Sequence, residues 1–178
     1  IFMDRIKLLN IEDASENSKE VLNSLAQKGK IINIFKVMAN SSAVLKTYFA
    51  INKTLKKKTL SNEIAERIAV QIAEINGCEY CLAAHSYISS KAGISDEEIK
   101  LSTCGKSKDL KIQAALDFAG SVMKNAGKVS DAEFEKIKAA GFSDGEILEI
   151  AAEVALNFFT NIINNISHTK VDFPKPKE

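Results

Sequence analysis

Hydrophobic residues recur at helical spacing along almost the whole chain, separated by short polar segments. The expected helices are a first one that follows Ser15–Ser18, then 31–38, 44–57, 61–75, 78–91, one that begins at Ser95, 107–125, 130–139 and 143–166. Alternating β-type patterns are nearly absent, and both prolines, Pro174 and Pro176, lie in the tail, where they interrupt no helix. The pattern therefore predicts an all-α fold.

Local signals for helix ends agree with this periodicity. Asn76-Gly77 and Ala92-Gly93 are break signals between two amphipathic segments. Ser61 has the position of an N-cap. Ser95, with Glu98 three residues later, predicts a capping box at the start of the next helix.

Two segments of the chain resemble each other at an offset of 82 residues: "LSNEIAERIAVQIAEIN" (60–76) and "FSDGEILEIAAEVALNF" (142–158). In the second segment's register, Thr160 and Ile163 stand where the first has Cys78 and Cys81. The expected organisation is one domain over residues 1–178, with a core motif at 60–92 and a degenerate second copy at 142–168.

Composition and charge exclude several classes of protein. Of the 178 residues, 46% are hydrophobic and 26% charged, which is typical of a soluble globular domain. The net charge of +1 gives no electrostatic reason to expect a nucleic acid as partner, and the run Lys56-Lys57-Lys58 is short enough to be a solvated helix end. No segment approaches the roughly 20 apolar residues that cross a bilayer, so no membrane partner is expected.

The expected compartment is the cytoplasm. The N-terminal "IFMDRIKLL" lacks the long apolar core and small-residue cleavage site of a signal peptide. Three cysteines do not form a disulfide framework of the kind found in small secreted domains.

The segment "NGCEYCLAAHS" (76–86) holds two of the three cysteines and one of the two histidines. Cys78, Cys81 and His85 are spaced i, i+3 and i+7, which at about 100° per residue places them on one stripe of a helix. The break at Asn76-Gly77 puts Cys78 at the helix N-terminus, where unpaired amides and the helix dipole favour thiolate. A nucleophilic thiol, a second thiol and a base are the groups that peroxide reduction requires.

Three other interpretations of the cluster are open. The thiols could simply pack in a helix core, because cysteine is among the most buried residue types. A zinc site is a second, for which the cluster supplies three ligands of the usual four, with Cys104 or His168 as a further candidate. A thioredoxin-type site is a third, but it requires a strand before the cysteines, which the pattern does not predict. The preferred redox interpretation involves no metal and no bound cofactor.

The longer segment "ERIAVQIAEINGCEYCLAAHS" resembles the core motif of the alkylhydroperoxidase D family, within the carboxymuconolactone decarboxylase superfamily. That motif is a glutamate, eleven residues, and then Cys-x-x-Cys-x-x-x-His. Glu66 lies twelve positions before Cys78 and fits this spacing. The tail "ALNFFTNIINNISHTKVDFP" is similar to that of peroxidase-related members, so the resemblance extends over most of the chain.

By position, the resemblance implies that Cys81 is the peroxidatic thiol and Cys78 the resolving one. Glu66 and His85 would form the proton relay, in which the carboxylate orients the imidazole and stabilises its charged form. The implied activity is thiol-dependent reduction of hydrogen peroxide or alkyl hydroperoxides, with an external dithiol reductant or adaptor protein. The resemblance also implies a homo-oligomer, trimeric or hexameric.

One position departs from the family pattern. Tyr80 stands where the founding peroxidases often have a histidine, and a phenol stays neutral near pH 7, so a shorter or weaker relay is expected. Two alternative functions remain: a non-enzymatic redox-sensing or adaptor protein that uses the same disulfide, and a carboxymuconolactone decarboxylase-type enzyme. Members with decarboxylase chemistry typically lack the cysteine pair.

A polar stripe marks the last predicted helix, where Asn157, Asn161, Asn164 and His168 are spaced i, i+4, i+7 and i+11. The preferred interpretation is a hydrated or interface-facing strip. The alternative is that the stripe lines a pocket opposite the thiols. Cys104, next to Gly105 at a predicted helix end, is interpreted as a bystander.

Overall fold

The computed structural model describes residues 5–176, so the first four residues of the N-terminal segment discussed above lie outside it. The described residues form nine helices and no strand, which confirms the all-α prediction. The helices are α1 (Glu16–Ala26), α2 (Asn33–Met38), α3 (Ser42–Leu55), α4 (Asn62–Ile75), α5 (Glu79–Lys91), α6 (Asp96–Thr103), α7 (Leu110–Lys124), α8 (Asp131–Ala139) and α9 (Asp144–Ser167). None of these described helices is both long and apolar enough to span a bilayer.

Serine side chains begin six of the nine described helices, which explains why the helix starts could be located from the sequence. Each accepts a hydrogen bond from the backbone amide three residues later. The capping serines are Ser15, Ser41, Ser61, Ser95, Ser130 and Ser143. The break at Asn76-Gly77 is also confirmed. Asn76 is the C-cap residue of α4, and Gly77 has a φ of 59°, a left-handed conformation that favours glycine.

The capping box predicted at Ser95 is only half formed, so that prediction is wrong. Ser95 accepts a hydrogen bond from the Glu98 amide at 3.2 Å, but the Glu98 carboxylate does not return to the Ser95 backbone. It forms an ion pair with Arg67 and accepts from the Ser107 hydroxyl at 3.2 Å. Arg67 is only 1% exposed, and a buried guanidinium requires a carboxylate partner more strongly than a helix end requires its cap.

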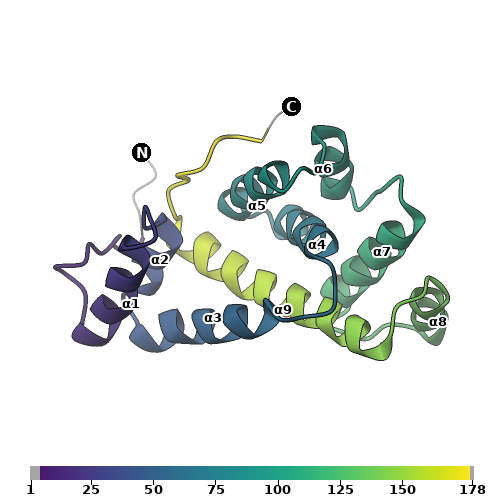
Figure 1. Cartoon of the computed structure of the whole chain (residues 1–178), viewed down its shortest axis with the longest axis horizontal. Coiled ribbons are helices and arrows are strands. Elements are labelled where there is room, and N and C mark those ends of the chain that lie inside the picture. Colours follow the sequence, from purple (N-terminus) through teal and green to yellow (C-terminus); the bar gives the residue numbers. More distant parts are fainter. Residues whose placement is uncertain (1–4, 177–178) are drawn as a thin grey trace.

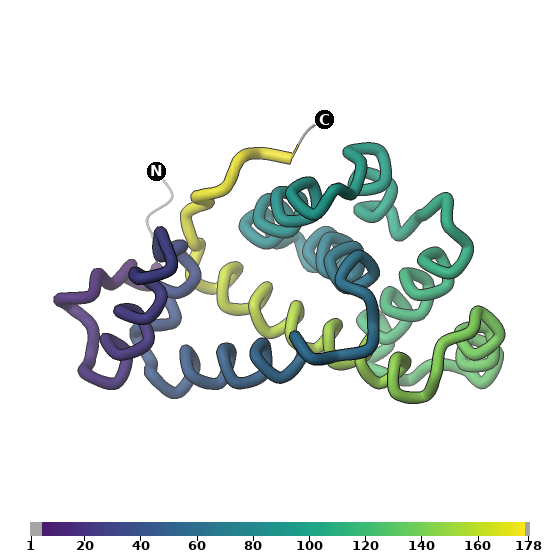
Figure 2. Tube along the Cα trace, in the orientation of Figure 1, coloured from purple at the N-terminus to yellow at the C-terminus, as the bar shows by residue number. Residues whose placement is uncertain are grey.

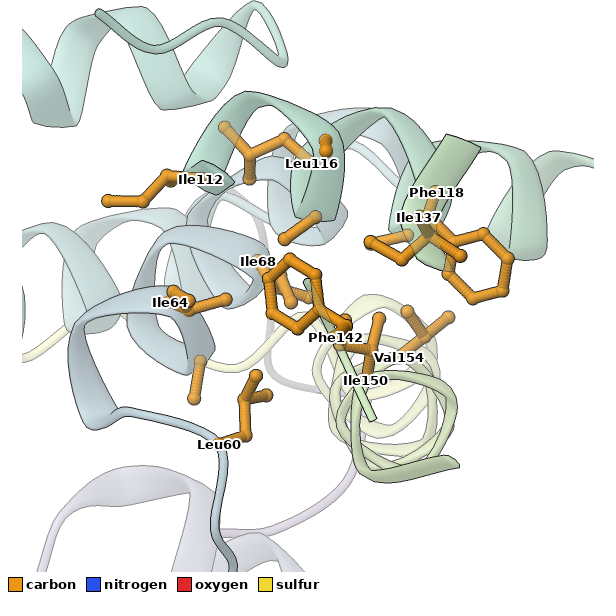
Figure 3. Close-up of a cluster of buried hydrophobic side chains, with 14 of the residues drawn as sticks. Leu60, Ile64, Ile68, Ile112, Leu116, Phe118, Ile137, Phe142, Ile150 and Val154 are labelled. Carbon is orange, nitrogen blue, oxygen red and sulfur yellow. The ribbon is translucent and has the colours of Figure 1, made fainter. Parts of the chain in front are cut away.

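One half of the molecule is organised around a hydrophobic cluster shared by α4, α7, α8 and α9. In Figures 1 and 2, α4 and α9 lie in the middle of the molecule and α6 to α8 at one end. α4 contacts both α9 and α7, and α8 packs on α7. Figure 3 shows the side chains that fill the space between these helices, among them Leu60, Ile64, Ile68, Ile112, Leu116, Phe118, Ile137, Phe142, Ile150 and Val154.

A second hydrophobic cluster fills the other half, between α1 to α3, the start of α5 and the end of α9. It contains the two cysteines of the thiol motif together with Tyr80 and apolar side chains of the N-terminal helices, such as Leu22, Met38 and Leu45. At about 1.5–3 kcal/mol for each large apolar side chain that is fully buried, this second cluster is a substantial stabilising unit of its own. The thiols therefore lie in a core.

The two segments that resemble each other in sequence become α4 and the first part of α9. Both helices begin after a capping serine, Ser61 and Ser143, at the offset of 82 residues, and they pack against each other. α4 ends at Ile75, whereas α9 continues without a break past Thr160 and Ile163 to Ser167. A duplication of a helical pair remains a prediction.

Candidate active site

Cys78 and Cys81 are joined by a disulfide at the start of α5, with a Cα–Cα distance of 5.3 Å. Cys78 is the N-cap residue and Cys81 lies in the first turn, as the break at Asn76-Gly77 predicts. Both cysteines are almost completely buried, at 1% and 2% exposure. The thiol pair therefore has the sequence-predicted place on the helix, but it is covered by other parts of the chain.

Each sulfur accepts a hydrogen bond from a nitrogen. The backbone N–H of Cys81 donates to Cys78 Sγ at 3.2 Å, which is the N-cap hydrogen bond of α5. The side-chain Nδ2 of Asn164, on α9, donates to Cys81 Sγ, also at 3.2 Å. N–H donors and a helix N-terminus stabilise negative charge, so these contacts oppose the effect of burial, which disfavours the thiolate.

Glu66 on α4 and His85 on α5 are brought together, with 2.8 Å between Glu66 Oε2 and His85 Nδ1. A carboxylate only accepts hydrogen bonds, so the hydrogen in this contact is carried by Nδ1. In the neutral imidazole Nε2 is then the nitrogen that can accept a proton. The pair is partly exposed, and His85 lies one turn after Cys81 on the same helix.

Tyr80 is buried, and its hydroxyl is used away from the relay. It donates to Asp172 Oδ1 at 2.8 Å and accepts from the Ile34 amide at 3.2 Å. Burial is the main cause that raises the pKa of Tyr80 above its ordinary value, so the side chain remains a neutral phenol. Neither hydrogen bond involves Glu66 or His85; Tyr80 instead attaches α5 to α2 and to the C-terminal segment.

The C-terminal segment after α9 lies across α5 and α2, and Asp172 is its main polar contact. Besides Tyr80, its carboxylate accepts from the Asn33 amide at 3.1 Å and is 3.7 Å from Lys30 Nζ. The ring of Phe173 meets Tyr80 edge-on, with 5.7 Å between centroids. Asp172 is a residue that the sequence reasoning missed, because its partners are at least 92 positions away in the chain.

A cavity of about 500 Å³ opens beside the relay pair. Glu66 and His85 form part of its wall, and Lys58 and Glu153, both nearly buried, pair across 3.1 Å at another part. Apolar side chains form a further part of the lining: Leu55, Ala65, Ala69, Ile88, Ala92 and Leu156. The cavity is large enough for a small organic molecule and is lined by both polar and apolar side chains.

Tyr48 also lines this cavity. Burial raises the pKa of Tyr48 to about 12, and the negative charges of Glu66 and Glu153 add to the effect. Its hydroxyl therefore keeps its proton over the working range of most enzymes and can donate a hydrogen bond into the cavity.

The asparagine stripe on α9 is buried, so the preferred interpretation of a hydrated or interface-facing strip is wrong. Asn157 lines the cavity, and Asn164 contacts Cys81. Asn161 accepts from Asn76 Nδ2 at 2.9 Å and so holds the turn between α4 and α5. His168 ends α9 in a left-handed conformation, with a φ of 50°. The alternative interpretation, a stripe that lines a pocket opposite the thiols, holds for Asn157 alone, because Asn164 contacts Cys81 directly and Asn161 binds the turn.

Cys104 ends α6, is exposed and lies outside the disulfide. Among residues 5–176, no group of three or more His, Cys, Asp or Glu side chains is arranged to hold a metal ion.

The fold and the site together define an all-helical protein with a Cys-x-x-Cys pair at a helix start and a Glu–His pair beside it. The sequence model of the carboxymuconolactone decarboxylase family matches residues 42–103, a segment that runs from α3 to α6 and contains the four motif residues. Residues 42–103 of the chain are thus similar to the carboxymuconolactone decarboxylase family, and this segment contains Glu66, Cys78, Cys81 and His85. A comparison with curated proteins found no match.

Solved structures share the fold over nearly the whole chain. An uncharacterised peroxidase-related protein from Ralstonia eutropha JMP134, described as an alkylhydroperoxidase AhpD core, has a TM-score of 0.86 and 23% identity, over 97% of this chain and 94% of that one. A peroxidase-related protein from Silicibacter sp. TM1040 has a TM-score of 0.80 and 23% identity, over 95% of each chain. The debrominase Bmp8 in complex with 2,3,4-tribromopyrrole has a TM-score of 0.77 and 19% identity, over 96% of this chain and 92% of that one. At these identities the likeness shows the fold alone.

Proposed function

We propose that the protein is a thiol-dependent peroxidase that reduces hydrogen peroxide or alkyl hydroperoxides. The observation that carries the proposal is one juxtaposition: a cysteine pair at bonding distance at a helix start, with a hydrogen-bonded Glu66–His85 pair one turn further on. The first supplies the two thiols that a peroxide oxidises, and the second supplies a group that can take and return a proton.

The proposed reaction begins with the Cys81 thiolate, whose proton His85 has accepted at Nε2. Its sulfur attacks the terminal oxygen of the hydroperoxide, the O–O bond breaks, and a sulfenic acid forms on Cys81. The alkoxide that leaves takes the proton from His85 and departs as the alcohol. The Cys78 thiol then loses its proton, its sulfur attacks Cys81, and hydroxide leaves with that proton as water. The disulfide is the product.

An external dithiol completes the cycle. One of its thiolates attacks the disulfide, a mixed disulfide forms, and the second thiol of the reductant resolves it, which leaves Cys78 and Cys81 as thiols and the reductant as a disulfide. A dithiol compound or a dithiol adaptor protein fits this step.

The cavity supports organic hydroperoxides as substrates. Its volume of about 500 Å³ greatly exceeds what hydrogen peroxide needs, and its apolar portion suits an alkyl group. Along α5, Ile88 and His85 line the cavity and Cys81 follows one turn beyond. A hydroperoxide with its alkyl group against Leu55 and Ile88 would direct its oxygens toward the relay pair.

We also propose a homo-oligomer, a trimer or a hexamer. It is supported by large apolar side chains exposed at four-residue spacing on α9: Phe158, Ile162 and Ile166. Helical stripes of this kind are typical of buried contacts between chains. Light scattering coupled to gel filtration tests it, and a monomer would contradict it.

Steady-state kinetics with tert-butyl hydroperoxide, hydrogen peroxide and an excess of a small dithiol test the proposed activity. The wild type should turn over many times, and each single turnover of reduced protein should consume two of its three thiols. Cys81→Ser should abolish turnover, and Cys78→Ser should form one sulfenic acid and stop. Cys104→Ser is the matched control and should retain the wild-type rate. If peroxide oxidises the protein slowly and only once, and no dithiol tested supports turnover, the protein would instead be a redox sensor or adaptor.

A further inference from the structure

Asn164 is the residue of α9 that reaches the reacting sulfur. Its Nδ2 donates to Cys81 Sγ at 3.2 Å, and its side chain is only 3% exposed. Its other polar atom, Oδ1, is buried and has no hydrogen-bond partner among the described residues. The amide nitrogen of Asn164 therefore contacts Cys81, whereas its amide oxygen accepts no hydrogen bond from a described residue.

The orientation of this amide follows from the chemistry of the disulfide. A disulfide sulfur carries no hydrogen and can only accept, so the NH₂ group must face Cys81 and the carbonyl oxygen must point elsewhere. A buried carbonyl oxygen without a donor is unfavourable and rare in folded proteins. Its presence beside a reactive sulfur indicates that the oxygen is used in another state of the site.

The neighbouring polar side chains on and just after α9 do not donate a hydrogen bond to Oδ1. Asn161, one turn earlier, accepts from Asn76, and its own Nδ2 is also buried without a partner. The hydroxyls of Ser167 and Thr169, which follow along the chain, are also buried and have no hydrogen-bond partner among the described residues. A group that reaches Cys81 to react would meet a donor and an acceptor already in place on Asn164.

We propose that Asn164 is a catalytic residue of this site, with two functions that rest on the peroxidase activity proposed above. Its Nδ2–H stabilises the Cys81 thiolate. Its Oδ1 accepts the hydrogen bond of the hydroperoxide O–H and so holds the terminal oxygen at the sulfur. After attack the same O–H belongs to the Cys81 sulfenic acid and remains hydrogen-bonded to Oδ1, so no proton moves in this contact.

The first function is tested without any peroxide. In a Cys78→Ser, Cys104→Ser background, Cys81 is the single thiol, and its ionisation can be titrated by thiolate absorbance near 240 nm. Asn164→Leu should raise the midpoint by about one pH unit or more, which is a tenfold loss of thiolate below the midpoint. Asn164→Asp conserves the volume but adds a negative charge, so it should raise the midpoint further.

The second function is tested above these midpoints, where the thiolate is fully formed in every variant. The rate constant for sulfenic acid formation with tert-butyl hydroperoxide should remain at least tenfold lower in Asn164→Leu than in the parent. Asn164→Asp restores an oxygen acceptor and should recover part of this loss. If the side chain only fills space, Asn164→Leu, which also fills the site, should retain the parent rate constant.

Asn161→Leu is the matched control, because Asn161 is equally buried on the same helix and contacts the turn rather than the sulfur. It should lower stability and leave the midpoint unchanged. A midpoint for Asn164→Leu within about 0.3 of the parent, or an equal shift in Asn161→Leu, would overturn the thiolate contact. Should Asn164→Leu not fold, Asn164→Ala also removes both polar atoms without adding a charge, and the same two limits apply to it.

The outcomes separate this inference from the proposed function. If the wild type turns over peroxide but the Asn164 variants keep the parent midpoint and rate, Asn164 is structural and the peroxidase stands. If the midpoint shifts but the wild type does not turn over peroxide, the peroxidase and the role of Oδ1 are overturned, and the thiolate contact is retained.

Discussion

Arg67 offers a quantitative test of how the relay helix is held. The residue follows Glu66 on α4, is 1% exposed and pairs with Glu98 of α6. Its Nε donates to the Ser102 hydroxyl at 2.9 Å, and a terminal nitrogen donates to the Lys106 carbonyl at 3.2 Å. We therefore expect Arg67→Met, which retains most of the volume and removes the charge, to loosen α4 from α6 and from the loop that follows it.

The expected magnitude follows from what the substitution leaves behind. Removing one partner of a buried ion pair costs about 3–5 kcal/mol, because the other charge remains without compensation. Here Glu98 is 19% exposed and keeps two donors, the Ser107 hydroxyl and the Lys108 amide, so the cost belongs at the lower end, about 3 kcal/mol. At about 2–4 °C per kcal/mol for a chain of this size, the melting temperature should fall by roughly 6–12 °C.

Urea unfolding followed by circular dichroism, with the disulfide intact, measures the effect, and a double-mutant cycle tests its cause. Glu98→Leu alone should also be destabilising, since the buried Arg67 would then have the exposed Glu63, at 4.0 Å, as its carboxylate partner beside two neutral acceptors. The double variant removes both charges, so its loss should be smaller than the sum of the single losses by at least about 1 kcal/mol. Losses that add to within about 0.5 kcal/mol would refute the buried-pair reasoning.

The neighbouring surface pair is the control for this cycle. Glu97, next to Glu98, contacts Lys108 at 2.6 Å, but both side chains are exposed. Glu97→Ala should therefore change the unfolding free energy by less than about 1 kcal/mol. A larger change would show that the loop, and not burial of the charge, determines the result.

Three further substitutions test the site and its surroundings. Glu66→Gln removes the carboxylate charge from the imidazole and should lower the rate of peroxide reduction by about 10²-fold in stopped-flow assays, with a wild-type rate as the contrary result. Asp172→Ala leaves the Tyr80 hydroxyl without its acceptor and should cost about 1–3 kcal/mol in urea unfolding, with faster proteolysis of the C-terminal segment; unchanged values would show that this contact is dispensable. Gly120→Ala places a Cβ 2.9 Å from Gln71 Nε2, the far end of a flexible side chain that can shift, so a net gain of up to about 1 kcal/mol from helix propensity is expected, and a net loss would contradict it.

The features that could be predicted from the sequence are local ones. Helix starts were found because a serine side chain caps a backbone amide three residues away, and the Cys78–Cys81–His85 stripe because one helix carries it. Glu66 is on another helix, and only the family resemblance connected it to His85.

The contacts that were missed join positions far apart in the chain, between side-chain types that sequence rules place elsewhere. Arg67 is charged, and charged residues are normally exposed, so nothing in the pattern indicates that it is buried against Glu98. For the same reason the sequence pattern predicts a hydrated strip for the asparagines of α9, which the structure buries. Asn164 meets Cys81 across 83 positions, and no local periodicity encodes such a contact.

The site lies where the two hydrophobic clusters meet, and both α4 and α9 contribute side chains to each cluster; Ala73 is the residue of α4 in the second. Val154 of α9 packs in the first cluster, and Phe159 and Ile163 pack against the second. The chain of α4 and α5 crosses the same boundary, but it does so with a break at Asn76-Gly77, which creates the helix start that the thiols need.

At the offset of 82 residues, Phe158 and Phe159 stand where the first segment has Asn76 and Gly77. Neither phenylalanine favours the left-handed conformation that Gly77 adopts, and α9 accordingly continues as one helix of 24 residues. That continuity lets a single element fix both sides of the site, because Asn157 lines the cavity beside the Glu66–His85 pair and Asn164 contacts Cys81 two turns later. The difference between the two segments therefore has a structural meaning: the broken helix carries the cysteine pair, and the unbroken one contacts Cys81 and lines the cavity beside the Glu66–His85 pair.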